Sequence, residues 1–253
     1  MRWNKILKEK LTALAIEYAR KRDFLYIANR DRTAGIFEHA HQNFHPASYN
    51  NIMNNNACGE RVNDGGDWLK SNSSAVLLMN IFCYPRVAKT KGIRKLLGLP
   101  EWVQPKFEVT AGVRRHPARN RNDEIDNTQL DMVIGDVIIE AKLTEADFGT
   151  SDEPPNYYGF ETVFHVNMLH QQGKKFKNYQ LIRNVLAARQ MKKRFFLICD
   201  YRRPDLIRDY LELIKCIRSY ADRNLCNLLT WQDICRRAPR DLKKYLLEKY
   251  NFY

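Results

Sequence analysis

The sequence lacks an apolar run long enough to cross a membrane. Its longest apolar stretch, residues 75–84, is interrupted by Asn80 and falls well short of the ~20 residues that a membrane-spanning helix needs. The first residues carry positive charge, but Lys8, Glu9 and Lys10 interrupt the apolar core that a secretory signal requires. We therefore expect a cytoplasmic protein that makes no membrane contact.

Cysteines are few and widely spaced, at positions 58, 83, 199, 216, 226 and 235. No two of them have the C-x-x-C spacing of zinc ribbons and zinc fingers, so a structural zinc site of that kind is not expected. Cys83 and Cys199 lie in apolar runs and are predicted to be thiols of the core. A reduced protein fits this pattern best.

Acidic residues are in deficit. The chain has 29 Asp and Glu against 42 Lys and Arg, which gives a formal net charge of +13. This balance favours polyanionic partners, with nucleic acid first and anionic membrane second. At 253 residues the chain is long enough for one large α/β domain with a small extension. We expect residues 68–253 to form the α/β core with C-terminal helices, and residues 1–67 to form an N-terminal helical extension and loop region.

The N-terminal region has two patterns. Residues 4–29 carry apolar residues at helical spacing and are predicted to form a helix or a pair of helices. Residues 31–67 have weak periodicity and are predicted to be loop, with at most one short helix. Within them, the sequence H-x-H-x-x-x-H contains His39, His41 and His45. No further ligand is evident, so we interpret these as polar residues of a short helix and its exit and not as a metal site.

Strands alternate with helices through the rest of the chain. A strand is predicted over residues 106–113, with Phe107 and Val109 on one face and Glu108 and Thr110 on the other. The other predicted elements are helices over residues 73–84, 178–192, 204–221 and 239–250 and strands over residues 195–200 and 225–230. Together with a central hairpin, this order indicates an α/β fold with a mixed sheet.

The central hairpin has a two-residue turn signal, Gly135-Asp136, between two β-branched apolar runs. Closing the turn places Ile134 opposite Val137. One face of the hairpin is then apolar throughout: Leu130, Met132, Ile134, Val137, Ile139, Ala141 and Leu143. Val133 and Ile138 are apolar on the other face, so we predict a hairpin in the middle of a covered sheet.

Three charged residues lie at the end of the hairpin that is away from the turn. Counting outward places Asp131 directly opposite Glu140, with Cβ atoms ~4.5–5.5 Å apart. Lys142 projects from the same face as Glu140, because side chains alternate along a strand. Facing carboxylates repel each other, which costs stability unless a cation lies between them. A divalent metal ion beside a lysine, as in a nuclease site, meets this need.

Asp131, an eight-residue spacer and then Glu140-Ala141-Lys142 resemble the PD-(D/E)XK nuclease superfamily, which includes restriction endonucleases and recombination nucleases. The longer string from Leu130 to Glu145 is similar to a group of bacterial restriction-endonuclease-like proteins. The resemblance covers roughly residues 70–235. It implies a restriction-endonuclease-like α/β fold, with a mixed central sheet flanked by helices, and it implies Asp131 and Glu140 as metal ligands.

Phosphodiester hydrolysis requires an activated water and stabilisation of the charge that develops on the phosphate. Carboxylates that hold Mg²⁺, or Mn²⁺ in its place, supply a Lewis acid, and two or three carboxylates are enough because Mg²⁺ keeps several waters. We assign Asp131 and Glu140 as ligands. Lys142 would orient the attacking water or neutralise the scissile phosphate. The alternative role for Lys142 is that of a charge partner for Glu140, without catalysis.

A third carboxylate often completes such a site. Glu108 is preferred as catalytic residue and ligand, because a strand fixes its side chain better than a loop does. The alternatives are Asp123, Glu124 and Asp126, which precede the hairpin. Glu145 is predicted to be a hydrogen-bonding partner of the site.

Two segments are predicted to contact nucleic acid. The loop before the hairpin contains four arginines that could grip phosphates, although a merely solvated loop is the alternative: Arg114, Arg115, Arg119 and Arg121. On the helix over residues 178–192, Gln180, Arg183 and Asn184 share one face. Gln180 and Arg183 are predicted contacts. Recombination-type members of the superfamily carry Q-x-x-x-Y on this helix, and Asn184 stands here at the tyrosine position.

The function predicted from these residues is a Mg²⁺-dependent deoxyribonuclease, an endonuclease of restriction, defence or repair type. The alternative is a nucleic-acid-binding module on a nuclease-like scaffold that does not cleave. Joint presence of Asp131, Glu140 and Lys142 favours the enzyme, because a binder needs none of them. The sequence leaves open an RNA substrate and a homodimer.

Overall fold

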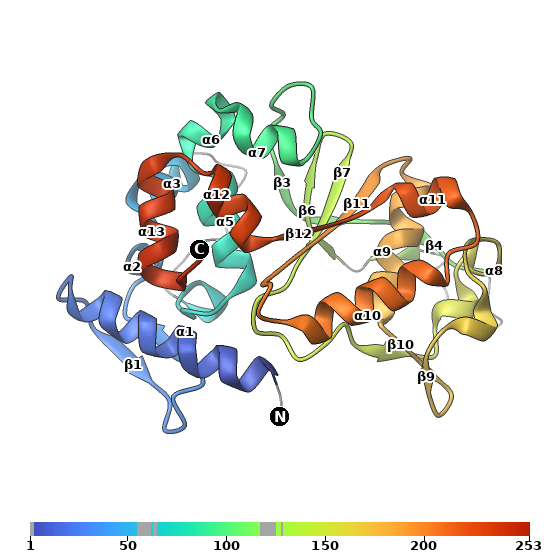
Figure 1. Cartoon of the computed structure of the whole chain (residues 1–253), viewed down its shortest axis with the longest axis horizontal. Helices are drawn as coiled ribbons and strands as arrows, with labels where there is room; N and C mark the ends of the chain where they lie inside the picture. The colour runs from blue at the N-terminus through green and yellow to red at the C-terminus, as the bar shows by residue number, and fades with distance from the viewer. Residues whose placement is uncertain (1–2, 55–61, 63–64, 117–124, 128) are drawn as a thin grey trace.

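A five-stranded mixed sheet lies at the centre of the computed structural model, which describes residues 3–54, 62, 65–116, 125–127 and 129–253 (Figure 1). The strand order across the sheet is β12-β11-β7-β6-β3. These strands span Lys106–Thr110 (β3), Gln129–Ile134 (β6), Val137–Ala141 (β7), Arg194–Cys199 (β11) and Cys226–Thr230 (β12). β7, β11 and β12 run parallel, while β6 is antiparallel to both of its neighbours. The predicted α/β class with a mixed sheet is confirmed.

The predicted hairpin is formed by β6 and β7. Its register pairs Ile134 with Val137, Val133 with Ile138, and Met132 with Ile139, as the turn signal predicts. Gly135 adopts a φ of +57°, a conformation that glycine reaches without strain, and so begins the turn. β7 is buried along its whole length, in agreement with a strand in the middle of a covered sheet.

Helices cover both faces of the sheet, and each face has its own apolar core (Figure 1). One core joins the sheet to α1 (Trp3–Arg20), α5 (Ser74–Phe82), α7 (Lys91–Leu96), α12 (Trp231–Arg237) and α13 (Arg240–Tyr250). The other core joins it to α9 (Tyr179–Gln190) and α10 (Pro204–Lys215). Because α1 belongs to the first core, the start of the chain packs directly on the α/β core.

The alternation of side chains breaks at one place in the sheet. On β6, Met132 packs in the first core but Leu130 packs in the second, although the two would share a face in a regular strand. On β3, Phe107 and Val109 are divided between the cores in the same way, which corrects the prediction that they share a face. Glu108 between them has a φ of +49°, a left-handed conformation that is uncommon for a residue other than glycine. The carboxylates therefore lie where the pleat is disturbed.

The N-terminal region contains more structure than predicted. The predicted helix over residues 4–29 is wrong beyond Arg20, because Asp23 adopts a left-handed φ of +55° after which the chain forms a two-stranded sheet. The elements before α5 are β1 (Tyr26–Ala28), β2 (Gly35–Phe37), α2 (Ala40–Asn43), α3 (Pro46–Met53) and a 3₁₀ turn, Gly66–Trp68.

The C-terminal half follows the prediction closely. The helix predicted over residues 204–221 is in fact two helices, α10 and α11 (Tyr220–Asn224). α12 was not predicted, although Thr230 and Asp233 form a capping box at its start. The remaining elements are α6 (Pro85–Lys89), β4 (Val113–Arg114), β5 (Ile125–Asp126), β8 (Thr150–Ser151), α8 (Phe160–Val163), β9 (Gln171–Gln172), β10 (Lys175–Lys177), and 3₁₀ turns Pro154–Asn156 and Val166–Met168.

Two further expectations concern cysteines and membranes. Cys83 and Cys199 are buried free thiols, as predicted, and Cys58 lies outside the described residues. In the described part of the chain, no helix has the length and apolar character needed to span a bilayer.

Candidate active site

A cavity of about 580 Å³ opens beside the end of the hairpin away from its turn. The start of α5 and Lys8 of α1 contribute to its wall. The wall carries four of the residues that sequence analysis assigns to the site or its surroundings: Glu108, Asp131, Lys142 and Glu145. Glu140 is not among the lining residues, because its side chain is buried behind them.

Asp131 is held in place by the backbone of the neighbouring strand. Its Oδ2 accepts a hydrogen bond of 2.7 Å from the Ala141 N–H, so a side chain replaces the backbone pairing expected at this position. Asp131 reaches the cavity, yet its carboxyl is enclosed enough that burial, and next the charge of Glu140, raise its pKa. The charge of Glu140 therefore acts on Asp131, as expected for two carboxylates at the same end of the hairpin.

Lys142 and Glu140 form an ion pair of 2.8 Å in which both side chains are almost fully buried. Burial alone would lower the pKa of Lys142, but the charge and hydrogen bond of Glu140, with the charge of Asp131, raise it above its usual value. Lys142 is therefore an ammonium ion at neutral pH, and it lines the cavity.

Asn184 of α9 is a second buried partner of Glu140. Its Nδ2 donates to Oε2 of Glu140 at 2.6 Å, and its Oδ1 accepts from Nε and Nη2 of Arg183 at 3.1 and 2.9 Å. Nη2 of Arg183 also donates to the Gln129 carbonyl of β6 at 3.3 Å. Because Arg183 holds the amide oxygen of Asn184, the amide NH₂ group is turned towards the Glu140 carboxylate and holds it in place.

Glu145 ties the segment after β7 to α5. Its Oε1 accepts from the Ser74 hydroxyl at 2.5 Å, and its Oε2 accepts from the Leu143 N–H at 2.6 Å. Arg203, which is fully buried, donates to the carbonyls of Glu145 and Ala146. Glu145 thus supports the wall of the cavity, and its charge acts on both Asp131 and Lys142.

Glu108 is in register with Asp131, because the pairs on either side of them in β3 and β6 keep a constant offset. Both line the cavity. Of the rival carboxylates, Asp126 is buried in a different cluster, and Asp123 and Glu124 lie outside the described residues. The preference for Glu108 as third carboxylate stays a prediction.

The donor set fits a hard divalent cation. Asp131 and Glu140 offer carboxylate oxygens, and two coupled negative charges are stabilised by a cation between them. Within the described residues, no three His, Cys, Asp or Glu side chains are grouped closely enough to hold a metal ion by themselves. Mg²⁺ keeps several waters and needs only one or two protein carboxylates, so this donor set suits Mg²⁺ better than a metal that demands a full protein shell.

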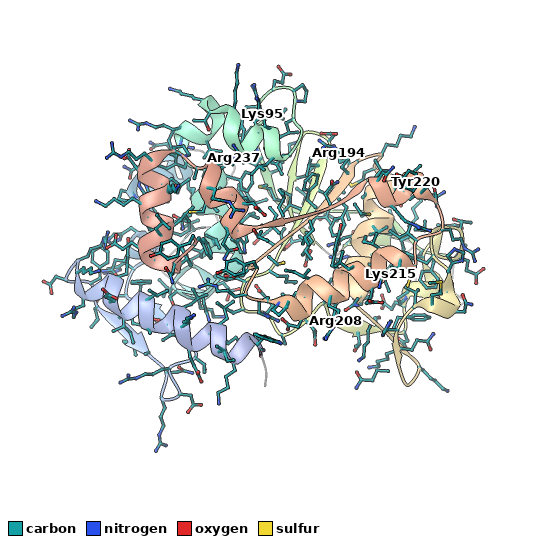
Figure 2. All side chains as sticks on the ribbon, in the orientation of Figure 1. Lys95, Arg194, Arg208, Lys215, Tyr220 and Arg237 are labelled. Carbon is teal, nitrogen blue, oxygen red and sulfur yellow. The ribbon has the colours of Figure 1, made fainter. Side chains whose placement is uncertain are left out.

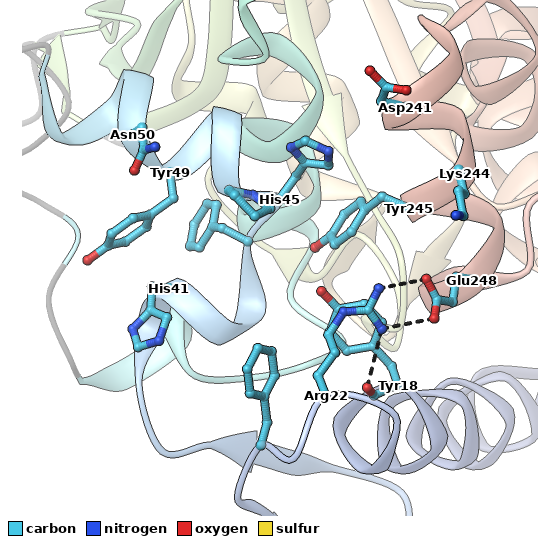
Figure 3. Close-up of a pocket in the computed structure, with 13 residues that line it drawn as sticks. Tyr18, Arg22, His41, His45, Tyr49, Asn50, Asp241, Lys244, Tyr245 and Glu248 are labelled. Atoms are coloured by element: carbon cyan, nitrogen blue, oxygen red, sulfur yellow. Dashed lines mark hydrogen bonds and ion pairs between the residues drawn. The ribbon is translucent and has the colours of Figure 1, made fainter.

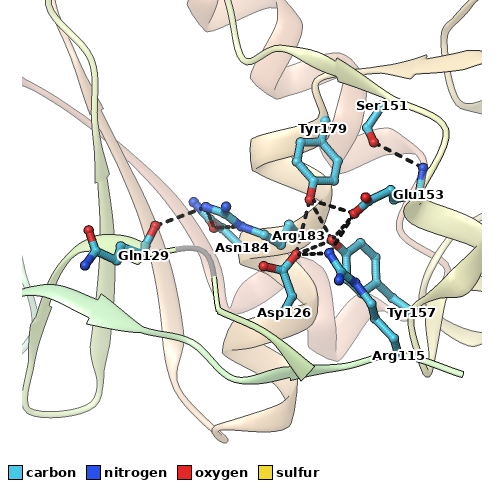
Figure 4. A network of polar contacts seen from close by, with 9 residues as sticks. All are labelled: Arg115, Asp126, Gln129, Ser151, Glu153, Tyr157, Tyr179, Arg183 and Asn184. Atoms are coloured by element: carbon cyan, nitrogen blue, oxygen red, sulfur yellow. Dashed lines mark hydrogen bonds and ion pairs between the residues drawn. The ribbon is translucent and has the colours of Figure 1, made fainter. Parts of the chain in front are cut away.

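Two arginines predicted to contact nucleic acid have internal partners instead. Arg183 is 2% exposed and bonded within the protein, so a phosphate contact does not fit its position. Arg115 donates to Asp126 at 3.1 Å and to Glu153 at 2.7 Å, in a network that also includes Tyr157 and Tyr179 (Figure 4): the Tyr157 hydroxyl donates to Asp126 and lies 2.6 Å from that of Tyr179. This network fixes the loops beside α9.

The other predicted contacts remain predictions. Arg114 is exposed and lines a cavity of about 1020 Å³ with Arg189, whereas Arg119 and Arg121 lie outside the described residues. Gln180 is half-buried near the start of α9. Basic side chains also come from α7, β11, α10 and α12, where Figure 2 labels Lys95, Arg194, Arg208, Lys215 and Arg237.

Sequence analysis missed the role of Asn184. The shared face of residues 180, 183 and 184 was visible, but a polar face on a helix ordinarily faces solvent. The available signal was the run of apolar residues around the rest of α9, since a helix that is apolar on most sides is buried. The three histidines lie on a short helix and at its ends, as predicted: His39 precedes α2 and stacks on His41 within it, and His45 caps α3.

Comparison with known proteins gives one match. The sequence model of a family described as "Restriction Endonuclease associating with ARP" matches residues 15–251. Neither a curated protein nor a solved structure matches the chain.

Proposed function

We propose a metal-dependent DNA nuclease, from the premise that this chain belongs to the family of restriction endonucleases associating with ARP. Family membership supports a nuclease-type function. The observation that carries the finer proposal is the meeting of Asp131, Glu140 and Lys142 at one end of a buried hairpin, beside an open cavity. This arrangement supports assignment of the site to the PD-(D/E)XK type and of the sheet to the restriction-endonuclease-like fold.

Each residue has a separate task in this proposal. Asp131 and Glu140 would hold Mg²⁺, which supplies a Lewis acid and a bound water of lowered pKa. Lys142, charged and lining the cavity, would orient the attacking water or neutralise the scissile phosphate. Asn184 keeps one oxygen of Glu140 occupied, so that the other side of the carboxylate is turned towards Lys142.

One observation favours a second candidate. The 2.8 Å ion pair already satisfies Lys142 and Glu140 as mutual charge partners, which is what a scaffold without catalysis would show. With the excess of basic residues, such a scaffold would be a non-cleaving nucleic-acid-binding module.

A cleavage assay distinguishes the two candidates. Purified protein is incubated with supercoiled plasmid, linear duplex, single-stranded DNA and RNA, each with Mg²⁺, Mn²⁺ or EDTA. The nuclease proposal expects DNA products with either metal and none with EDTA. Binding without products on every substrate would favour the module, and products formed equally well in EDTA would exclude a metal-dependent site.

Divalent cations are expected to stabilise the wild-type fold through the two coupled carboxylates. Excess Mg²⁺ or Mn²⁺ should raise the Tm by mass action, with about 2.7 kcal/mol of stabilisation at 100 times the Kd. Asp131→Asn removes one like charge while its side-chain oxygen can still accept from the Ala141 N–H. This variant should melt no lower than wild type without metal and gain little from metal, as measured by calorimetry.

The matched control is Asp152→Asn, at an exposed position in the loop after β8. It should show the full metal-induced shift. Equal shifts in Asp131→Asn and wild type would place the ion elsewhere.

DNA binding in EDTA is expected to depend steeply on salt, because phosphate contacts release counterions. Replacing Arg114, Arg119 and Arg121 together with Ala should make the slope of log K against log[salt] shallower by about 1 for each lost contact. Arg115→Ala should leave that slope unchanged and lower the Tm, because it removes an ion pair from each of Asp126 and Glu153. An unchanged slope in the triple variant would mean that this loop is merely solvated.

A further inference from the structure

An aromatic cavity of about 560 Å³ lies where α1, α2, α3 and α13 meet (Figure 3). None of the residues that line the carboxylate cavity lines it. Its lining is unusually aromatic and comes from segments far apart in the sequence: Tyr18, Phe24, His41, Phe44, His45, Tyr49 and Tyr245. A concave site of this size accommodates a small organic ligand.

The aromatic rings of the cavity differ in burial and pack against one another. Tyr18, Phe44 and Tyr245 are almost fully buried, while Tyr49 is half-buried and His41 is exposed. The Tyr49 ring lies 6.0 Å from Phe44 and 6.1 Å from His41, and Tyr18 lies 5.9 Å from Tyr245. Tyr49 and His41 leave ring surface open to a flat aromatic ligand, and their contacts with neighbouring rings limit the side-chain freedom that they would lose on stacking.

Polar groups lie among the rings. Nδ1 of His45 accepts from the Ala47 N–H at 3.1 Å, and burial lowers the pKa of His45, so the neutral ring carries its proton on Nε2. Asn50 adds an exposed amide at the rim. A neutral imidazole donor and an amide are groups that hydrogen-bond the edge of a nucleobase.

A basic cavity of about 830 Å³ adjoins the aromatic one. The two share four lining residues: Arg22, Asp241, Lys244 and Glu248. Both acids already have cations, since Glu248 forms a bidentate pair with Arg22 and Asp241 pairs with Arg86. Arg240, Lys243 and Lys244 therefore give the basic cavity an excess of positive charge, which suits a phosphate.

We propose that the joined cavities bind a nucleotide, with its base among the aromatic rings and its phosphate against the basic residues. Aromatic stacking beside a basic groove is how proteins hold unpaired bases. Lys8 at the carboxylate cavity and Tyr18 here are both in α1, ~15 Å apart along the helix at 1.5 Å per residue. One strand could reach both. Nucleotide binding here goes beyond the proposed nuclease function and does not require cleavage.

The test measures base-dependent binding in EDTA, where the proposed nuclease cannot act. The probe is a fluorescent duplex with one unpaired adenosine, compared with the same duplex carrying an abasic residue there. Wild type should bind the duplex with the unpaired adenosine tighter by about 5- to 150-fold, the range for one stacked base. Tyr49→Ala and His41→Ala should each reduce this preference, and Tyr49→Phe should keep it. Tyr220→Ala, at a 75% exposed ring of α11 (Figure 2), is the matched control and should change nothing.

Adenosine monophosphate as competitor identifies the source of the nucleotide. Displacement of the bulged duplex by the free nucleotide supports a free ligand, and resistance to it supports a base within a strand. Replacing Lys243 and Lys244 with Ala should weaken the binding of both duplexes to the same extent, because both duplexes carry the phosphate. The proposal would be overturned if wild type bound the two duplexes equally and did not bind the free nucleotide. It would also be overturned if a folded Tyr49→Ala/His41→Ala protein kept the preference for the unpaired adenosine.

Discussion

Replacing Lys142 with alanine is expected to abolish metal-dependent cleavage, with a loss on the order of 10²–10³ in rate, the usual effect of removing one transition-state contact. Lys142 lines the cavity and is held as an ammonium ion by Glu140. Most DNA affinity should remain, because one lysine is a small part of the basic surface. Cleavage and binding are measured on the same preparation.

The control must separate catalysis from folding. Lys142→Ala removes the cation that pairs with the buried carboxylate of Glu140, which keeps the hydrogen bond from Asn184, so some loss of Tm is expected. Lys142→Arg keeps the charge but should also fail to cleave, since a planar guanidinium cannot take the place of a compact ammonium. Lys106→Ala removes an exposed lysine of β3 and should cleave normally. A folded, metal-binding Lys142→Ala protein that cuts at the wild-type rate would contradict the assigned role.

The hairpin was predictable because its determinants are local. A two-residue turn sets the register of the strands on both sides, and the apolar pattern sets which residues are buried. Asp131, Glu140 and Lys142 follow from counting along those strands; in the structure Glu140 forms an ion pair with Lys142, and its charge acts on Asp131. Even so, the backbone pair expected between Asp131 and Glu140 is replaced by a side-chain bond to Ala141.

The break in the pleat was not predictable from the sequence. Nothing in the order Phe107-Glu108-Val109 marks a left-handed residue, and both flanking residues suit a regular strand. The break lies where β3 and β6 pass from one apolar core to the other. The two cores exist only once the helices are in place, so the position of the break is a property of tertiary packing.

Arg115 and Arg183 show a related limit. Charged residues are ordinarily exposed, so both were assigned to the surface. Each instead donates hydrogen bonds to partners that are distant in sequence, such as Glu153 for Arg115 and Gln129 for Arg183. Sequence patterns identify faces of helices and strands, but they do not identify what covers a face.

Asn184→Leu is expected to cause the largest loss of stability at the site, about 3–6 kcal/mol, because it removes buried hydrogen bonds to two charged groups, worth about 1.5–3 kcal/mol for each group. Leucine has a similar volume but leaves Arg183 with the Gln129 carbonyl as acceptor and Glu140 without one donor. The double variant Arg183→Met/Asn184→Leu should recover part of this loss, because no buried guanidinium then lacks the Asn184 acceptor. Asn227→Leu on β12 is the control and should shift the free energy of unfolding by less than about 0.5 kcal/mol.

A second measurement shows whether Asn184 also positions Glu140 for metal. Groups that orient a metal ligand typically contribute 10- to 100-fold to metal affinity or activity. For Asn184→Leu, assayed well below its Tm, we therefore expect the Mg²⁺ concentration for half-maximal cleavage to rise by about that factor. Loss of stability alone would reduce the amount of active protein without moving that concentration. If the variant is destabilised but keeps the wild-type Mg²⁺ dependence, Asn184 holds the core together and does not prepare Glu140 for an ion.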